Sequence, residues 1–186
     1  MANEHQLKQT RGKLEQSKKY ELLTNDTIEL GGGVTLFRIK ALISFGNVEK
    51  GELGGYVEKE DNLCHSGNAW VTGNARVYSN ADVSGNAKVY DNALVSGYAK
   101  VTDNARVYSN ARVFGDAKVY DNAKVTDNAL VYGNAKVYGD AWVTDNAWVT
   151  GNAKVTGNAE VTSIAWVTGN AKVTGNAKVS GGELLN

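Results

Sequence analysis

Proline is absent from the 186 residues, and cysteine occurs once, as Cys64. Because proline cannot donate a hydrogen bond to a β-ladder, its absence suits a chain in which nearly every backbone amide is paired. A single cysteine excludes an intramolecular disulfide framework and favours a reducing compartment. No run of about 18 apolar residues could span a membrane, and residues 1–20 lack the apolar core of a signal peptide. We therefore expect a cytoplasmic protein that does not bind membranes.

Net charge is also lacking, because 20 basic residues balance 20 acidic residues. Zero net charge argues against nucleic acid as a partner, since phosphate binding depends on an excess of positive charge. Histidine occurs only as His5 and His65. Cys64 and His65 are neighbours that point to opposite faces of a strand, and no other cysteine or histidine could complete a zinc site. We therefore predict no metal site and no cofactor.

The feature that dominates the sequence is a repeat of six residues. Valine stands at every sixth position from Val71 to Val179, 19 times without a break, in the template V-x-[G/D/S]-[N/D]-A-x. In each hexad, Ala-x-Val-x is a short extended segment whose Ala and Val point to the same side. The Gly-Asn pair then turns the chain, and we expect Asn at left-handed corners. Three hexads would close an 18-residue triangular coil with Val and Ala inside.

The template resembles the hexapeptide repeat of left-handed parallel β-helices, with Val at the first position and Ala, a small residue, at the fifth. This resemblance implies an all-β, single-domain, left-handed triangular solenoid. The phase continues backwards to Leu53 through weaker hexads, and it puts His65 at a valine position below the first repeats. We assign residues 53–180 to the β-helix, which amounts to about seven coils that each stabilise their neighbours.

The segments outside the repeat are assigned from their composition. Residues 1–19 are polar and are interpreted as a flexible or helical tail, and residues 181–186 as a short C-terminal tail. Residues 20–52 contain two alternating β-segments around Gly31-Gly32-Gly33, which predict a hairpin. Because an open solenoid end exposes core and strand edges, we expect this hairpin to cap the first coil.

A second resemblance covers the junction between the hairpin and the repeats. Residues 36–42, 45–48, 51–57 and 62–63, leading into Gly67-Asn68-Ala69-Trp70, resemble the start of phage and prophage hexapeptide-repeat proteins of the YdcK-like group. The resemblance implies a phage or prophage origin and therefore the cytoplasm of a bacterial host. It also suggests a phage protein or a host protein, such as a defence component, as a partner.

Residues 18 apart should stack into columns on the three outer sides of the rod. One column carries five lysines, and two tyrosines lie beside it: Lys100, Lys118, Lys136, Lys154, Lys172, Tyr120 and Tyr138. We interpret this side as a solvated face that limits aggregation. The alternative is a site for an anionic, nucleotide-like ligand in grooves between subunits.

Another side carries aliphatic and aromatic residues at outward positions, and two corners beside it break the Asn/Asp rule. The outward residues are Leu94, Phe114, Leu130, Tyr132, Trp148 and Trp166, and the two corners are Tyr98 and Ile164. A contiguous apolar strip on a surface indicates an interface, and aromatic residues are enriched in interfaces. We predict that this side forms a homo-oligomer, either a trimer or a dimer.

Similarity to hexapeptide-repeat acyltransferases provides the only enzyme hypothesis. Those enzymes use a histidine general base, often in a loop between coils, because the acceptor must be deprotonated near neutral pH. Residues 66–186 contain no histidine, and no hexad is interrupted from Val71 onwards, so we predict no catalytic residues. The favoured interpretation is a non-enzymatic, self-associating scaffold. A nucleotide-like ligand binder is the first alternative, and an acyltransferase is the second.

Overall fold

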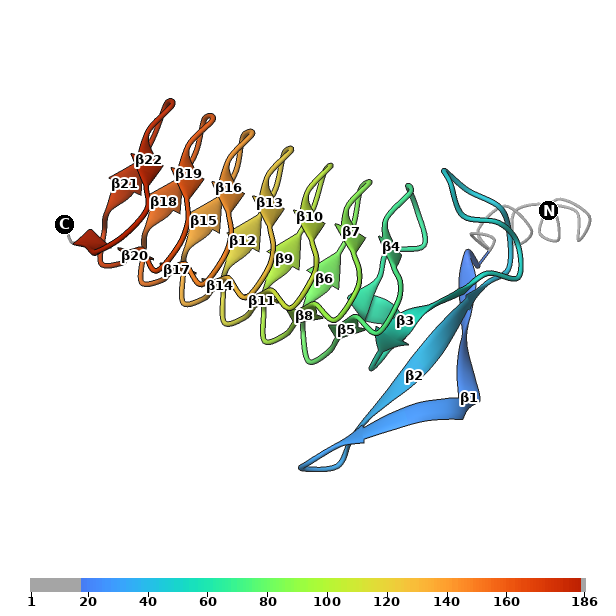
Figure 1. Ribbon diagram of the computed structural model, residues 1–186. Coiled ribbons are helices and arrows are strands. Elements are labelled where there is room, and N and C mark those ends of the chain that lie inside the picture. Colours follow the sequence, from blue (N-terminus) through green and yellow to red (C-terminus); the bar gives the residue numbers. More distant parts are fainter. Residues whose placement is uncertain (1–17, 185–186) are drawn as a thin grey trace, which may run out of the picture.

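The computed structural model describes residues 18–184, which form a rod of stacked coils with a β-hairpin at its N-terminal end (Figure 1). The described chain contains no α-helix and makes a parallel β-solenoid of about seven coils with an 18-residue spacing. The predicted fold class, an all-β solenoid behind an N-terminal hairpin, is confirmed. No helix in this part of the chain is long and apolar enough to cross a membrane.

Three sheets form the sides of the rod, and each predicted column lies on one of them. The lysine face is the six-stranded sheet of β6 (Asp82–Val83), β9 (Lys100–Val101), β12 (Lys118–Val119), β15 (Lys136–Val137), β18 (Lys154–Val155) and β21 (Lys172–Val173). The mixed face is the seven-stranded sheet of β4 (Trp70–Val71), β7 (Lys88–Val89), β10 (Arg106–Val107), β13 (Lys124–Val125), β16 (Trp142–Val143), β19 (Glu160–Val161) and β22 (Lys178–Val179).

The apolar face belongs to the longest sheet, which has ten strands. Its solenoid strands are β5 (Arg76–Val77), β8 (Leu94–Val95), β11 (Arg112–Val113), β14 (Leu130–Val131), β17 (Trp148–Val149), β20 (Trp166–Val167) and β23 (Glu183–Leu184). The sheet continues into the cap through β3 (Leu53–Val57), β2 (Val34–Ala41) and β1 (Tyr20–Leu30). The cap strands pair antiparallel with one another, and β3 pairs parallel with β5, so the hairpin extends one side of the rod.

The core is a single column of Val and Ala. Every repeat Val and Ala from Ala69 to Val173 is almost completely buried. The backbone of each short strand forms hydrogen bonds with the next coil. For example, Lys118 N donates to Ala135 O at 2.9 Å, and Tyr120 N donates to Val137 O at 3.1 Å. Because each coil buries only three valines and three alanines, these ladders and coil-to-coil stacking stabilise the rod.

The corners differ from the prediction, because the left-handed residue is the one before the asparagine. Positive φ values occur at Gly, Asp and Ser of the third template position, for example φ 58° at Asp103 and 69° at Gly97. The corner carboxylates offset the strain by accepting amides of the following coil, as Asp145 does from Ser163 N at 2.9 Å. The asparagines instead stack along the corners, where their side-chain amides hydrogen bond at the 18-residue spacing.

The register of the first coil also differs from the prediction. Val57 pairs with Val77, and Leu63 pairs with Val83, so both spacings are 20 residues rather than 18. Trp70 and Lys88 restore the 18-residue spacing. Leu63, which is fully buried, therefore takes the core position that the sequence phase assigned to His65. His65 and Ser66 are two extra residues at the corner that follows the short 3₁₀ helix η1 (Glu60–Asn62).

Candidate functional site

The aromatic part of the apolar face is a continuous stack. Register places Trp148 beside Trp166, and their rings lie 4.8 Å apart with an angle of 15° between planes. In the neighbouring outward column, Phe114 and Tyr132 stack at 4.9 Å and 3°. Tyr132 meets Trp148 edge to face at 6.4 Å, which joins the two columns. We call the cluster of Phe114, Leu130, Tyr132, Trp148 and Trp166 the aromatic strip.

Three residues predicted for the same surface lie outside this cluster. Leu94 is separated from Leu130 by Arg112, which occupies the coil between them. Tyr98 is 63% exposed at the corner towards the lysine face, where it lines a groove with Lys100. Ile164 is 70% exposed at the opposite corner, two residues before Trp166 in the chain. The strip therefore occupies the C-terminal half of the apolar face, and Ile164 lies at its edge.

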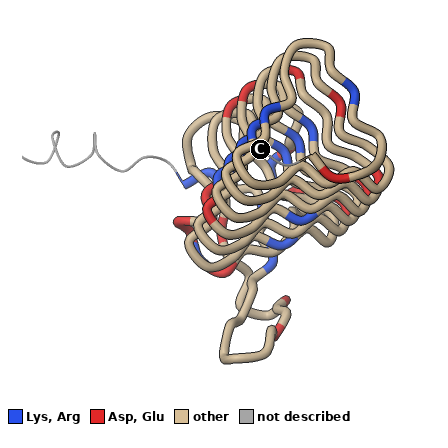
Figure 2. The backbone as a smooth tube through the Cα atoms, turned by 90° about the vertical axis from the view of Figure 1, so that its left-hand side faces the viewer, with Lys and Arg blue, Asp and Glu red and all other residues tan. Residues whose placement is uncertain are grey.

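The lysine column has the predicted geometry. Lys100, Lys118 and Lys136 are adjacent in register, and Lys154 and Lys172 continue the column. A groove of about 640 Å³ runs beside it and is lined by Tyr98, Lys100, Asp116, Lys118, Asn134, Lys136, Asn152 and Lys154. Basic and acidic positions recur from coil to coil along the rod (Figure 2). Asp116 places a carboxylate in the groove, which reduces its attraction for anions.

Tyr120 and Tyr138 lie on the lysine face but do not line this groove. Their rings stack at 4.8 Å with an angle of 4° between planes. Burial, with smaller contributions from the neighbouring Tyr138 and Asp121, raises the pKa of Tyr120 above its ordinary value. This tyrosine pair therefore forms a stacked ladder outside the groove of the predicted anion site.

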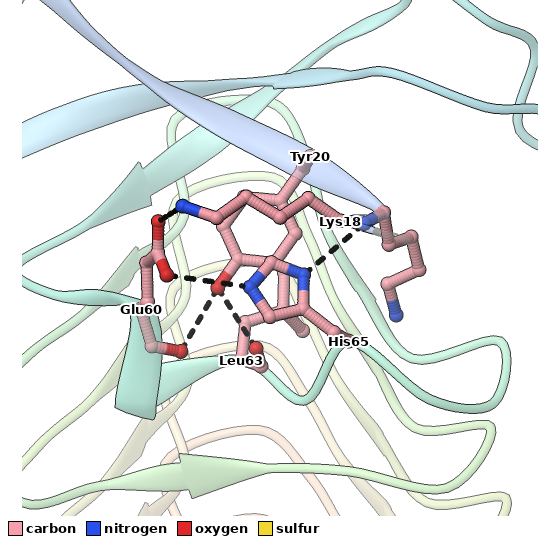
Figure 3. A network of polar contacts seen from close by, with 6 residues as sticks. Lys18, Tyr20, Glu60, Leu63 and His65 are labelled. Carbon is pink, nitrogen blue, oxygen red and sulfur yellow. Dashed lines mark hydrogen bonds and ion pairs between the residues drawn. The ribbon is translucent and has the colours of Figure 1, made fainter. Parts of the chain in front are cut away.

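A network of polar contacts joins the hairpin to the first coil (Figure 3). The His65 ring stacks on Tyr20 at 4.4 Å, and its Nδ1 accepts the backbone amide of Lys19 at 3.2 Å. The Tyr20 hydroxyl can donate to Leu63 O at 2.8 Å or to Glu60 O at 2.9 Å. Burial and, secondarily, the Glu60 carboxylate raise the pKa of this tyrosine far above its usual range. These contacts fasten the cap to the rod.

Lys19 is the residue at this junction that sequence reasoning missed, because it was assigned to the polar tail. Its side chain is almost completely buried. The Lys19 ammonium donates to Ala69 O at 2.8 Å and lies 4.7 Å from the centre of the Phe45 ring. Burial lowers the pKa of Lys19 from 10.5 to about 8. No periodic pattern marks this lysine, so the sequence offered no signal for its burial. The rest of the predicted tail, residues 1–17, lies outside the described chain.

His65 and Cys64 lie at the junction of the cap and the first coil, and their contacts are local. The two nitrogens of His65 face the Lys19 amide and, at 3.7 Å, the Glu60 carboxylate. Cys64 Sγ lies 3.0 Å from Ser66 Oγ. Within residues 18–184, no group of three or more His, Cys, Asp and Glu side chains could hold a metal ion. His5 lies outside these residues.

One further groove, on the mixed face, was not anticipated from the sequence. It has a volume of about 500 Å³ and lies between the cap loop at Gly46–Val48 and the side chains of Trp70, Lys88 and Tyr90. The Tyr90 ring also stacks on Tyr108, with 4.8 Å between ring centres. The hexad pattern alone could not predict this groove, because the cap loop forms one of its walls.

Comparison of the chain with models of protein families and with curated proteins found no match.

Proposed function

We propose that this protein is a non-enzymatic interaction scaffold that self-associates through the aromatic strip. The observation that carries the proposal is the continuous stack of Phe114, Tyr132, Trp148 and Trp166 on one face of a rigid rod. Trp166 is 44% exposed, and Ile164 adds an exposed apolar residue at the edge. Contiguous apolar area of this kind is characteristic of interaction surfaces, whereas isolated exposed apolar residues are ordinary.

The energetics support association of two such surfaces. Full burial of one large apolar side chain contributes about 1.5–3 kcal/mol, and association costs on the order of 4–15 kcal/mol. Apart from Trp166, the strip residues are already partly buried, so each adds only a fraction of this value. A symmetric contact nevertheless buries ten such side chains, five from each copy, and their summed gain can exceed the cost. Tryptophan is also the commonest hot-spot residue, and stacked rings lose little conformational freedom on binding. The second copy is therefore the partner that we favour for this surface.

A phage or prophage origin belongs to the same proposal. It rests on the likeness of residues 36–63 to the start of phage hexapeptide-repeat proteins. In that setting the assembled rods would present their remaining faces to a phage or host protein in the bacterial cytoplasm. Pull-downs from infected and uninfected host lysates with the assembled wild-type protein would identify such a partner.

Sedimentation of matched tryptophan variants tests self-association. We expect the wild type to be an oligomer at micromolar concentration and the double variant Trp148→Lys with Trp166→Lys to be a folded monomer. The control is Trp142→Lys on the mixed face, where the exposed tryptophan contacts Lys124 outside the strip. A wild type that stays monomeric at this concentration contradicts the proposal, as does a control that dissociates as fully as the double variant.

The groove beside the lysine column supports a second candidate, an anion-binding site for a nucleotide-like ligand. Four lysines line it, and Lys100 and Lys118 are exposed. Its test is calorimetry with adenosine triphosphate as the probe, in the wild type and in a variant with Lys118, Lys136 and Lys154 all changed to Gln. Saturable binding that is lost in the variant favours the ligand site. No binding, with the oligomer unchanged, favours a solvated face.

A further inference from the structure

The outward column of the apolar face carries one charge at each end of its apolar part. Register places Arg112 beside Leu130 at the N-terminal end. The column continues through the two tryptophans, and Trp166 lies beside Glu183 at the C-terminal end. Read along the rod, the column is basic, then apolar in three coils, then acidic. Arg112 and Glu183 are exposed, and neither forms an ion pair within residues 18–184.

Two identical faces can meet with their rods aligned in two ways. When the rods are parallel, as in a trimer around a long axis, every residue lies level with its own copy. Arg112 then lies level with the partner's Arg112, and Glu183 with the partner's Glu183. When the rods are antiparallel about an axis level with Trp148, the order is reversed. Arg112 then faces the partner's Glu183, and Leu130 faces the partner's Trp166.

The charge order distinguishes these two arrangements. Like charges brought together across an interface oppose association, and opposite charges fix its register and orientation. In the antiparallel arrangement, apolar residues face apolar residues. Arg112 of each copy also faces Glu183 of the other copy, which gives two pairs of opposite charges in each dimer. The parallel arrangement keeps the apolar contact, but it places each charged residue beside a residue of the same charge on the other copy. A two-fold axis is also the commonest symmetry of soluble oligomers.

We infer that the partner of the aromatic strip is a second copy of this chain that runs antiparallel, with a two-fold axis level with Trp148. The inference rests on the proposed self-association and adds its stoichiometry and direction. It also leaves the two caps at opposite ends of the dimer, with the lysine faces free.

Charge reversal tests the pairing of Arg112 with Glu183. Arg112→Glu alone and Glu183→Arg alone each turn two attractive contacts per dimer into repulsive ones. We expect each to raise the dissociation constant about tenfold, given the modest size of exposed ion pairs. The double variant restores opposite charges across the interface, and its dissociation constant should return to within about twofold of the wild type. A double variant as weak as the singles overturns the antiparallel register.

Cross-linking through single cysteines tests the direction independently. In a Cys64→Ser background, Thr150→Cys lies on the coil of Trp148, next to the axis, and should cross-link to its own copy with a short bis-maleimide. Arg76→Cys lies four coils from the axis, so two copies would be roughly 38 Å apart and should not cross-link. In a parallel assembly, the Arg76→Cys copies are level and cross-link.

Three outcomes separate the two proposals. A dimer with rescue by charge reversal and with Thr150→Cys cross-links alone supports both. An oligomer whose Arg76→Cys copies cross-link, without rescue, overturns the antiparallel inference and leaves self-association intact. A monomeric wild type overturns both.

Discussion

The amide ladder along one corner of the rod ends at Asn146, because Ile164 takes the place of the next asparagine. Four side-chain hydrogen bonds link Asn74 to Asn146 through the intermediate coils, and the last is donated by Asn128 at 3.3 Å. Ile164 follows in the same column and is 70% exposed. The ladder is therefore interrupted on the coil that carries Trp166, at the edge of the aromatic strip.

We predict that Ile164→Asn has opposite effects on folding and on association. The new amide can extend the ladder from Asn146, which should stabilise the rod by about 0.5–1.5 kcal/mol, at the lower end because the site is exposed. Loss of the apolar side chain should weaken the dimer. Thermal unfolding and sedimentation measure the two effects. The control Ile164→Ala should weaken the dimer to the same degree without the gain in stability, and equal stabilities for the two variants would contradict the ladder explanation.

A buried charge in the valine column should break the rod, whereas the same charge one residue away should not. Val119→Asp places a carboxylate in a fully buried position without a partner, which we expect to cost at least about 3 kcal/mol and to unfold or split the solenoid. Lys118→Asp, on the same strand, changes an exposed residue flanked by two lysines and should change stability by less than about 1 kcal/mol. Circular dichroism melts compare the two. Similar melts would mean that the valines do not form the core.

The sequence predicted the repeating part of this structure well because one residue spacing determines it. Once valine recurs every six residues, position 148 must lie beside position 166, and both tryptophans must point outward because their neighbouring valines point inward. Strand register confirms this arrangement. The interface role assigned to these residues remains a proposal, because the spacing places side chains but does not identify a partner.

The departures from prediction occur where the repeat meets other structure. His65 and Ser66 are an insertion of two residues, which the sequence did not reveal because the first hexads match the template weakly. Leu63, rather than a valine, occupies the core position opposite Val83. The buried Lys19 had no periodic signal, because contacts with Ala69 and Phe45 determine its position. At the corners, both Gly and Asn tolerate a positive φ. Local propensity therefore could not decide which of the two adopts it.

We predict that the protein does not transfer acyl groups. Incubation with acetyl-CoA and a panel of sugar and amine acceptors should release no free thiol above background. The reason is that the single histidine of the described chain, His65, stacks on Tyr20 and accepts the Lys19 amide, so its Nδ1 is not free to act as a base. Turnover that disappears in His65→Asn would contradict this prediction. A hexapeptide-repeat acyltransferase assayed with the same acceptors serves as the positive control.

Stability should increase from about pH 8 to pH 10 because of the buried Lys19. In the folded protein the pKa of Lys19 is about 8, which lies below its ordinary value of 10.5. Below pH 8 both the folded and the unfolded chains carry the charge, and the full desolvation cost opposes folding. Between these two pKa values the unfolded chain binds more protons, so the free energy of unfolding rises with pH, by at most about 1.4 kcal/mol per pH unit. Above pH 10 the raised pKa of Tyr20 acts in the opposite direction, because the folded state then retains a proton that the unfolded state loses.

Urea unfolding at intervals between pH 7 and pH 10 measures this dependence. The variant Lys19→Met removes the titrating amine and should abolish the rise, whatever its stability at pH 7. Lys18→Met is the matched control, since the neighbouring lysine is exposed and pairs with Glu60 at 2.6 Å. This control should keep the rise. If the free energy of unfolding of Lys19→Met rises with pH as steeply as that of the wild type, then the buried charge of Lys19 does not weaken the packing of the cap against the rod.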